Sequence, residues 1–253
     1  MENLKATLRQ LLPRGALEAY RRHKQRRQDR RERRLSAEQM FTLIYTDARW
    51  GGPRGSFCSG SGSHEDSIVG PYIRSLATQL QQLGAGSLTA VDLGCGDFSI
   101  GRQLAQHCGR YVGVDIVKPL IEHNQASFGT QRVAFRHLNI IEDALPEGDI
   151  CFVRQVFQHL SNAQILAVLP KLARYRWCFI TEHHPSAEHL RSMNLDKRHG
   201  ADIRLYRGSG VFLERPPFNI PQDRYRLVLE VPGQMPPGVD PGVIRTFLFE
   251  PQR

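Results

Sequence analysis

The strongest structural constraint in this chain is an alternation of short apolar runs with segments of helical periodicity, which begins at Ala90. Apolar runs of this length are typical of buried strands. They predict strands at Ala90–Leu93, Tyr111–Asp115, Val133–Leu138, Asp149–Val153 and Trp177–Thr181. The segments between them predict helices at Ser99–Cys108, at Pro119–Ser127, and from a capping box at Ser161–Gln164 to about Leu172. Strands that alternate with helices predict a parallel sheet with right-handed crossovers.

The C-terminal part has a different pattern. Arg224–Val231 and Val243–Phe249 are two further strand-like runs, and the Pro/Gly-rich link between them contains no helical segment. This pair is predicted to be antiparallel, because parallel neighbours need a long crossover. We therefore expect an α/β fold with a doubly wound, mostly parallel, seven-stranded sheet and an antiparallel C-terminal strand.

Three parts are predicted along the chain: a basic N-terminal tail over residues 1–35, a helical lid with a Gly/Ser loop over 36–88, and the sheet domain over 89–253. In the second part, Ser36–Gln39 has the pattern of a capping box that opens a short helix. A helix is also predicted over Tyr72–Leu83.

Two segments carry alternative interpretations. The glycine- and serine-rich loop over residues 50–63 either closes over a ligand or is a solvated connector. Residues 185–223 form an insert before the last two strands. This insert either recognises a substrate or is a structural cap. The polar residues that suggest recognition are Asn194, Asp196, Arg204 and Arg207.

The basic charge is concentrated in the tail. Residues 1–35 carry a net charge of +8 out of a formal +9 for the whole chain. Three interpretations stay open: a solvated helix, contact with an anionic membrane surface aided by leucines at 4, 8, 11 and 12, or binding to nucleic acid. The near-neutral remainder argues against nucleic acid as the substrate, because enzymes that act on nucleic acids spread positive charge over the face that meets the phosphates.

The sequence favours a cytoplasmic protein, with the inner membrane face as the alternative that the tail suggests. No apolar run approaches the roughly 20 residues that span a bilayer. The N-terminus lacks the apolar segment of a secretory signal. The five cysteines are scattered and include no Cys-x-x-Cys pair, which fits a reducing compartment.

The turn after the first predicted strand indicates a ligand site. Gly94 and Gly96 let the backbone bend sharply and approach a ligand without an intervening Cβ. Asp115 ends the second strand, where a carboxylate can accept hydrogen bonds from both hydroxyls of a ribose. A dinucleotide fingerprint would have a third glycine where Ser99 stands, and Asp97 disfavours a pyrophosphate. An ammonium-bearing nucleoside such as S-adenosylmethionine suits the turn better.

Several segments resemble the motifs of class I S-adenosylmethionine-dependent methyltransferases, which have a Rossmann-like fold. Val91–Asp97 and Val112–Asp115 resemble their first and second motifs, and Leu138–Ile140 resembles the loop beside adenine. Val153–Leu160 resembles the segment after the fourth strand in small-molecule members. The resemblance implies that S-adenosyl-L-methionine is the cofactor.

The same resemblance implies residue roles. Gly94 and Gly96 would pass under the methionine moiety, and Asp92 and Asp97 would hold its polar end. Asp115 would bind the ribose. The residues implied around the adenine and the sulfonium are Ile116, Asn139 and Gln155. Many relatives have Asp in place of Asn139, but an amide can still bond the adenine edge.

The resemblance extends to bacterial surface-glycan and small-molecule O-methyltransferases, through the N-terminal Leu-x-x-Leu-Leu-Pro segment and the Gly/Ser loop. It implies a sugar, glycan or other small-molecule acceptor. One alternative is an RNA or protein methyltransferase, but Arg154–Phe157 stands where an Asn/Asp-Pro-Pro-Tyr/Phe motif would be expected. Another is a non-catalytic cofactor-binding partner subunit, although the glycine turn and the ribose carboxylate are intact.

An acceptor hydroxyl benefits from a general base, and His159 is the candidate because it follows the fourth strand on the ligand side. Its alternative role is to pack or cap the turn before Ser161. Glu182, His183 and His184 follow the fifth strand and are alternative bases or substrate ligands. No metal site is expected, because adjacent histidines on an extended segment point in opposite directions.

Overall fold

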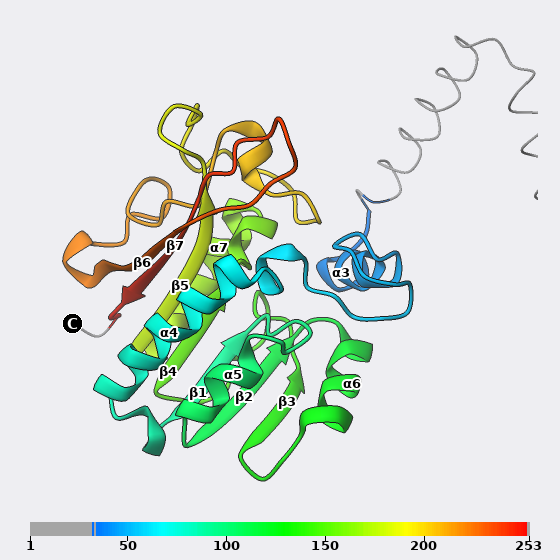
Figure 1. Cartoon of the computed structure of the whole chain (residues 1–253), viewed down its shortest axis with the longest axis vertical. Coiled ribbons are helices and arrows are strands. Elements are labelled where there is room, and N and C mark those ends of the chain that lie inside the picture. The colour runs from blue at the N-terminus through cyan, green and yellow to red at the C-terminus, as the bar shows by residue number, and fades with distance from the viewer. Residues whose placement is uncertain (1–31, 33, 252–253) are drawn as a thin grey trace, which may run out of the picture.

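The computed structural model describes residue 32 and residues 34–251, so the predictions for the leucines at 4, 8, 11 and 12 lie outside the described residues. Its centre is a seven-stranded sheet in the order β3-β2-β1-β4-β5-β7-β6 (Figure 1). The strands are β1 Thr89–Leu93, β2 Arg110–Asp115, β3 Val133–His137, β4 Ile150–Arg154, β5 Trp177–His184, β6 Tyr225–Pro232 and β7 Val243–Phe249.

Strand directions confirm the predicted mostly parallel sheet. Strands β1 to β5 pair in parallel, whereas β7 pairs antiparallel with both β5 and β6. The order reverses at β1, which has β2 on one side and β4 on the other. In an open α/β sheet this reversal creates a crevice beyond the carboxyl ends of the strands, where ligands bind.

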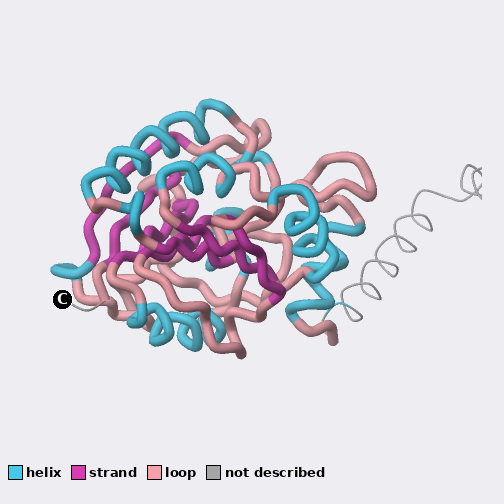
Figure 2. The backbone as a smooth tube through the Cα atoms, turned by 90° about the horizontal axis from the view of Figure 1, so that it is seen from below, coloured by secondary structure: helices cyan, strands magenta, loops and turns pink. Residues whose placement is uncertain are grey.

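Helices cover both faces of the sheet, and Figure 2 shows the strands as a layer between them. On one face, α4 (Asp66–Gln82) and α5 (Gly101–Leu104) pack over Ala90 and Tyr111. On the other face, α7 (Asn162–Val168) packs over the alternate strand residues, such as Val91. The helix α6 (Lys118–Phe128) lies beside β3 at one end of the sheet (Figure 1). The period-two alternation of strand side chains therefore supplies two apolar cores.

Both predicted capping boxes are present. Ser36 caps α3 (Ala37–Thr46) and Ser161 caps α7, each with the reciprocal bond from the glutamine three residues later. The cap at Ser161 fixes the chain direction directly after the turn that contains His159. In the part of the chain that the structure describes, no helix is both long and apolar enough to cross a membrane.

Several element boundaries differ from the prediction. The helix predicted to about Leu172 ends at Val168 and is followed by a 3-10 helix. The helix predicted at Ser99–Cys108 is only the short α5, followed by a 3-10 turn. Strand β5 continues to His184, because its last three residues pair with β7. The helix predicted from Tyr72 begins at Asp66 and includes Pro71. Burial of Ile68 and Val69 offsets the hydrogen bond that a proline cannot donate.

Candidate active site

A cavity of about 290 Å³ lies at the carboxyl ends of β1, β2 and β4, where the strand order reverses. Every residue that the sequence placed at the cofactor lines it: Asp92, Gly94, Gly96, Asp97, Asp115, Ile116, Asn139 and Gln155. His159 lines the same cavity. The fold therefore brings the predicted cofactor residues and the predicted base together.

The turn after β1 requires glycine at both positions. Gly94 and Gly96 have φ angles of 78° and 54°, in the left-handed region that side chains rarely adopt. A Cβ at Gly94 would lie 2.6 Å from Cγ2 of Val156, and one at Gly96 would lie 2.3 Å from Oγ of Ser59. Glycine at these positions therefore lets the Val156 and Ser59 side chains, which also line the cavity, pack directly on the turn.

The Asp115 carboxylate forms the floor of the cavity beside this turn. It accepts hydrogen bonds from the backbone N–H of Gly96 at 3.2 Å and of Val117 at 3.0 Å. Burial raises its pKa to about 6, although these backbone donors favour the charged form. The carboxylate is fixed in place and is ionised at neutral pH.

Two charged side chains, Asp92 and Arg154, lie partly desolvated beside the start of the turn. The Tyr111 hydroxyl donates to Asp92 at 2.9 Å, and burial raises the pKa of Asp92 to about 7. The Arg154 guanidinium lies 4.8 Å from the centre of the Tyr72 ring. Burial lowers the Arg154 pKa. Among the described residues, the buried Nε of Arg154 has no hydrogen-bond partner, so this cation has capacity for an anionic ligand group.

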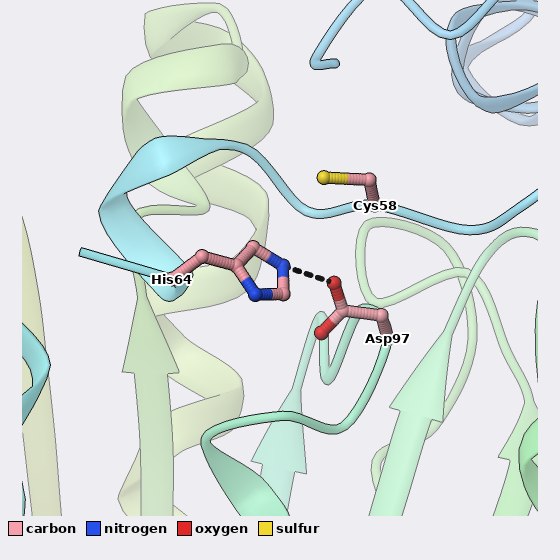
Figure 3. A group of neighbouring side chains, drawn as sticks. All are labelled: Cys58, His64 and Asp97. Atoms are coloured by element: carbon pink, nitrogen blue, oxygen red, sulfur yellow. Dashed lines mark hydrogen bonds and ion pairs between the residues drawn. The ribbon is translucent and has the colours of Figure 1, made fainter. Parts of the chain in front are cut away.

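Asp97 connects the turn to the Gly/Ser loop. Its Oδ2 accepts from the Ser59 N–H and from His64 Nε2, both at 2.8 Å, and its Oδ1 accepts from the Ser99 N–H at 3.0 Å. Figure 3 shows the His64 ring directed at the carboxylate. Burial favours a higher pKa for Asp97, but the hydrogen bonds from Ser99, Ser59 and His64 outweigh it and lower the pKa.

The Gly/Ser loop forms part of the cavity wall through residues 59–63. Arg154 donates to the Gly62 carbonyl at 2.6 Å, and the Ser99 hydroxyl donates to the Ser63 carbonyl at 3.3 Å. The hydroxyls of Tyr45 and Ser59 lie 3.1 Å apart. These bonds hold the loop on the cavity, so it is not simply a solvated connector.

His159 lies against an aromatic wall of the cavity, which Phe41, Tyr45 and Trp50 form. Its Nδ1 donates to the Gly200 carbonyl at 3.1 Å, because a carbonyl can only accept. Its Nε2 is then the acceptor of the ring, and the Gln158 side-chain N–H donates to it at 3.4 Å. The His159 ring centre is 5.0 Å from that of Trp50. Burial lowers the pKa of His159 to about 3, so the ring is neutral at physiological pH.

The alternative bases, predicted to follow the fifth strand, are the last three residues of β5 and occupy three different environments. Glu182 accepts from the backbone N–H of Phe157 and Gln158, and therefore fixes the turn that precedes His159. Burial raises its pKa to about 8. The rings of His183 and His184 bond to different carbonyls, those of Pro241 and Val211. Of these three residues, only His183 lines the cavity.

The insert over residues 185–223 lines part of the cavity, but not with the polar residues that suggested substrate recognition. Asn194 donates to the carbonyls of Phe212 and Pro216, and Arg204 donates to the Leu160 carbonyl. Asp196 accepts from the Asn162 N–H. These side chains hold the insert together. The residues that line the cavity are Ala201, Ile203 and Tyr206, and no periodic pattern or motif marked them in the sequence.

Comparison with known proteins agrees with this geometry. Residues 90–176, which carry the glycine turn, Asp115 and the His159 segment, match the family model described as a methyltransferase domain. The chain therefore contains a methyltransferase domain. Among curated proteins, none matches the sequence of this methyltransferase significantly.

Two solved structures show the same fold as this methyltransferase. Magnesium protoporphyrin IX methyltransferase from Synechocystis, with bound S-adenosylmethionine, has a TM-score of 0.51 at 15% identity, over 85% of this chain and 98% of that chain. Human N-acetylserotonin methyltransferase, in complex with S-adenosylmethionine, has a TM-score of 0.51 at 12% identity, over 85% and 60% of the two chains. At this identity the likeness concerns the fold.

Proposed function

We propose that this methyltransferase transfers a methyl group from S-adenosylmethionine to a hydroxyl of a sugar, a glycan end or another small molecule. One observation carries the proposal: a single cavity joins the glycine turn and Asp115 to an aromatic wall that contains His159. Its volume of about 290 Å³ is at the small end of the range for small-molecule sites, roughly 300–1,000 Å³. Such a cavity suits a cofactor and a small acceptor group.

The chain's residues fit the cofactor. Asp115 would accept hydrogen bonds from the ribose hydroxyls, Ile116 would pack on adenine, and Asn139 would bond its edge; all three line the cavity. At the other end, Asp92 would face the ammonium of the methionine moiety, and Asp97, whose oxygens already accept from Ser59, His64 and Ser99, would border it. The unpartnered Nε of Arg154 supports this orientation. When bound, S-adenosylmethionine supplies an electrophilic methyl group on a sulfonium.

His159 accepts the proton of the acceptor hydroxyl in this proposal. The bond from Nδ1 to Gly200 orients the ring and leaves Nε2 as the proton acceptor, from which the acceptor hydroxyl displaces the long 3.4 Å hydrogen bond of Gln158. The low pKa of the ring is no obstacle, because a hydroxyl oxygen becomes strongly acidic as it gains a methyl group and positive charge. Glu182 is a positioning residue, since it binds the backbone of the turn that carries His159.

Cofactor binding is expected to weaken below pH 6. Asp115 binds the ribose as a carboxylate and has a pKa of about 6 without ligand, so affinity is retained above that pH and falls by up to about tenfold per pH unit below it. Calorimetry of S-adenosylhomocysteine binding between pH 5 and 8 measures this. Asp115→Asn should bind weakly and lose the limb near pH 6. Asp92 has a pKa of about 7, so Asp92→Asn identifies any change in affinity near pH 7 that comes from Asp92. An Asp115→Asn variant with the same pH profile as the wild type would contradict the assignment of the ribose to Asp115.

Trp50 is expected to act on the acceptor and not on the cofactor. Its ring packs against His159, and its Nε1 donates to the Ala201 carbonyl at 3.5 Å. Trp50→Ala should raise the acceptor KM by about tenfold, from lost stacking and buried area. Trp50→Phe keeps an aromatic face and should change KM much less. An unchanged KM in Trp50→Ala, measured by initial rates, would remove the aromatic wall from acceptor binding.

A methyl-transfer screen with labelled cofactor tests the acceptor class. The full chain is incubated with free sugars, glycan-bearing lipids, RNA and protein, and the label in each fraction is counted. Label in a sugar or another small hydroxyl compound is the expected result. Label only in RNA or protein would overturn the proposed acceptor class. Binding of S-adenosylhomocysteine is measured separately, so that cofactor binding is tested apart from the acceptor. The near-neutral charge of residues 36–253 favours the first result.

The proposal also places the enzyme in the cytoplasm, with its basic tail on the inner membrane face. The net charge of +8 and the leucines of residues 1–35 support this contact, since basic segments with apolar residues bind anionic lipid surfaces. Deletion of residues 1–34 should abolish binding to anionic liposomes while methylation of a soluble acceptor continues. Equal liposome binding by the deletion variant would exclude this role of the tail.

A further inference from the structure

Three side chains that are typical metal ligands meet at the edge of the cavity. Cys58 and His64 belong to the Gly/Ser loop and the residue after it, and Asp97 belongs to the turn after β1 (Figure 3). One ligand atom of each, the thiol sulfur, a ring nitrogen and a carboxylate oxygen, lies within 4.8 Å of the other two. Figure 3 shows the Cys58 sulfur beside the bonded imidazole and carboxylate.

We propose that Cys58, His64 and Asp97 form a zinc site that fixes the Gly/Ser loop onto the turn. Zinc binds sulfur at about 2.3 Å and nitrogen or oxygen at about 2.0–2.2 Å, so its ligand atoms lie roughly 3.3–3.8 Å apart. Atoms already within 4.8 Å reach this geometry by small side-chain rotations. A thiolate with an imidazole favours zinc over magnesium or calcium, which bind oxygen ligands.

The surroundings of Asp97 support the site. The backbone N–H of Ser59 and of Ser99 each donate to its carboxylate, and these bonds orient the group toward His64. Metal-bound carboxylates are commonly held by such outer hydrogen bonds. The His64 side chain is 45% exposed, so an ion has access from solvent and a water molecule can complete a tetrahedral set.

Sequence spacing did not reveal this site, and the proposal departs from the expectation of no metal. Cys58 and His64 are six residues apart, and Asp97 is 33 residues further along the chain, which is not a known zinc spacing. Two ligands come from the loop and one from the sheet domain. The ion would therefore stabilise the closed loop, and it would bind poorly when the loop is away from the turn.

Metal titration of the full chain, stripped with a chelator and free of cofactor, tests the proposal. Calorimetry should give one zinc ion per chain, and cobalt should give the thiolate-to-metal charge-transfer absorption of a cysteine ligand. Cys58→Ser should abolish that absorption, and both Cys58→Ser and His64→Gln should weaken zinc binding by at least tenfold. His107→Gln, on an exposed turn away from the trio, is the matched control and should bind zinc like the wild type.

Hydrogen exchange adds a second measurement, because the ion should slow exchange of the backbone amides of residues 58–64 in the wild type but not in Cys58→Ser. Thermal melting of each variant shows that it is folded. Zinc binding that is unchanged in both Cys58→Ser and His64→Gln, or a cobalt complex without thiolate absorption, would overturn the site. His64 and Asp97 would then form only a hydrogen-bonded loop contact. Because no cofactor or acceptor is present, these results are independent of the proposed reaction.

Discussion

Replacing Asp115 with alanine is expected to weaken S-adenosylhomocysteine binding by about 10- to 150-fold at pH 7.5, which corresponds to about 1.5–3 kcal/mol. The carboxylate is buried at the cavity floor, and backbone N–H groups hold it in place. It is therefore preorganised, and hydrogen bonds from a ribose to an ionised acceptor are the stronger kind. Calorimetry or equilibrium dialysis measures the dissociation constant directly.

The control for this substitution must separate binding from folding. Asp115 also accepts from Gly96 and Val117, so its removal leaves two buried donors without their acceptor. Asp115→Asn keeps one acceptor oxygen and should preserve the turn better while still losing most of the affinity. Thermal melting of both variants tests their fold. Unchanged affinity in a folded Asp115→Ala variant would show that the ribose is held elsewhere.

The parts of the site that the sequence predicted are those encoded within one strand and the turn that follows it. Gly94, Gly96 and Asp115 stand at strand ends, and the strand order alone brings those ends together. His159 follows in the same way from β4. A local pattern is sufficient here, because the parallel sheet fixes where each strand ends.

The contacts of the Gly/Ser loop could not be predicted from the sequence, and the reason is physical. Ser59 bonds to Asp97 across 38 residues, and the Gly/Ser loop has no hydrophobic periodicity that would specify its path. Trp50 begins this loop and Arg154 lies in the Val153–Leu160 segment, but neither pattern indicated that these two side chains line the cavity. The length of β5 was also underestimated, since its last residues are strand only because β7 pairs with them.

The insert shows why polar residues can mislead. Asn194 and Arg204 suggested substrate recognition, yet both are buried and hydrogen-bonded to backbone carbonyls of the protein. A long segment without regular strands must satisfy its backbone groups by other means, and these side chains do so. The residues that reach the cavity, such as Ile203, are the apolar ones.

His159→Ala is expected to lower kcat by about 10²- to 10⁴-fold with little change in S-adenosylhomocysteine affinity, if His159 is the proton acceptor. Wild-type kcat at saturating cofactor should show no limb near pH 6.5, because burial lowers the pKa of this histidine to about 3. The limb near pH 6 should appear in cofactor affinity instead, through Asp115. Single-turnover rates across the pH range separate the two.

Loss of packing could imitate this effect, because His159 supports the Trp50 ring. His159→Gln fills most of the space and retains hydrogen-bonding groups, but its amide does not take up a proton. Both variants should therefore be slow if proton transfer matters, whereas only the alanine variant should be slow if packing is the cause. Near-normal turnover in His159→Gln together with a large loss in His183→Gln would move the base to His183, the other histidine on the cavity wall.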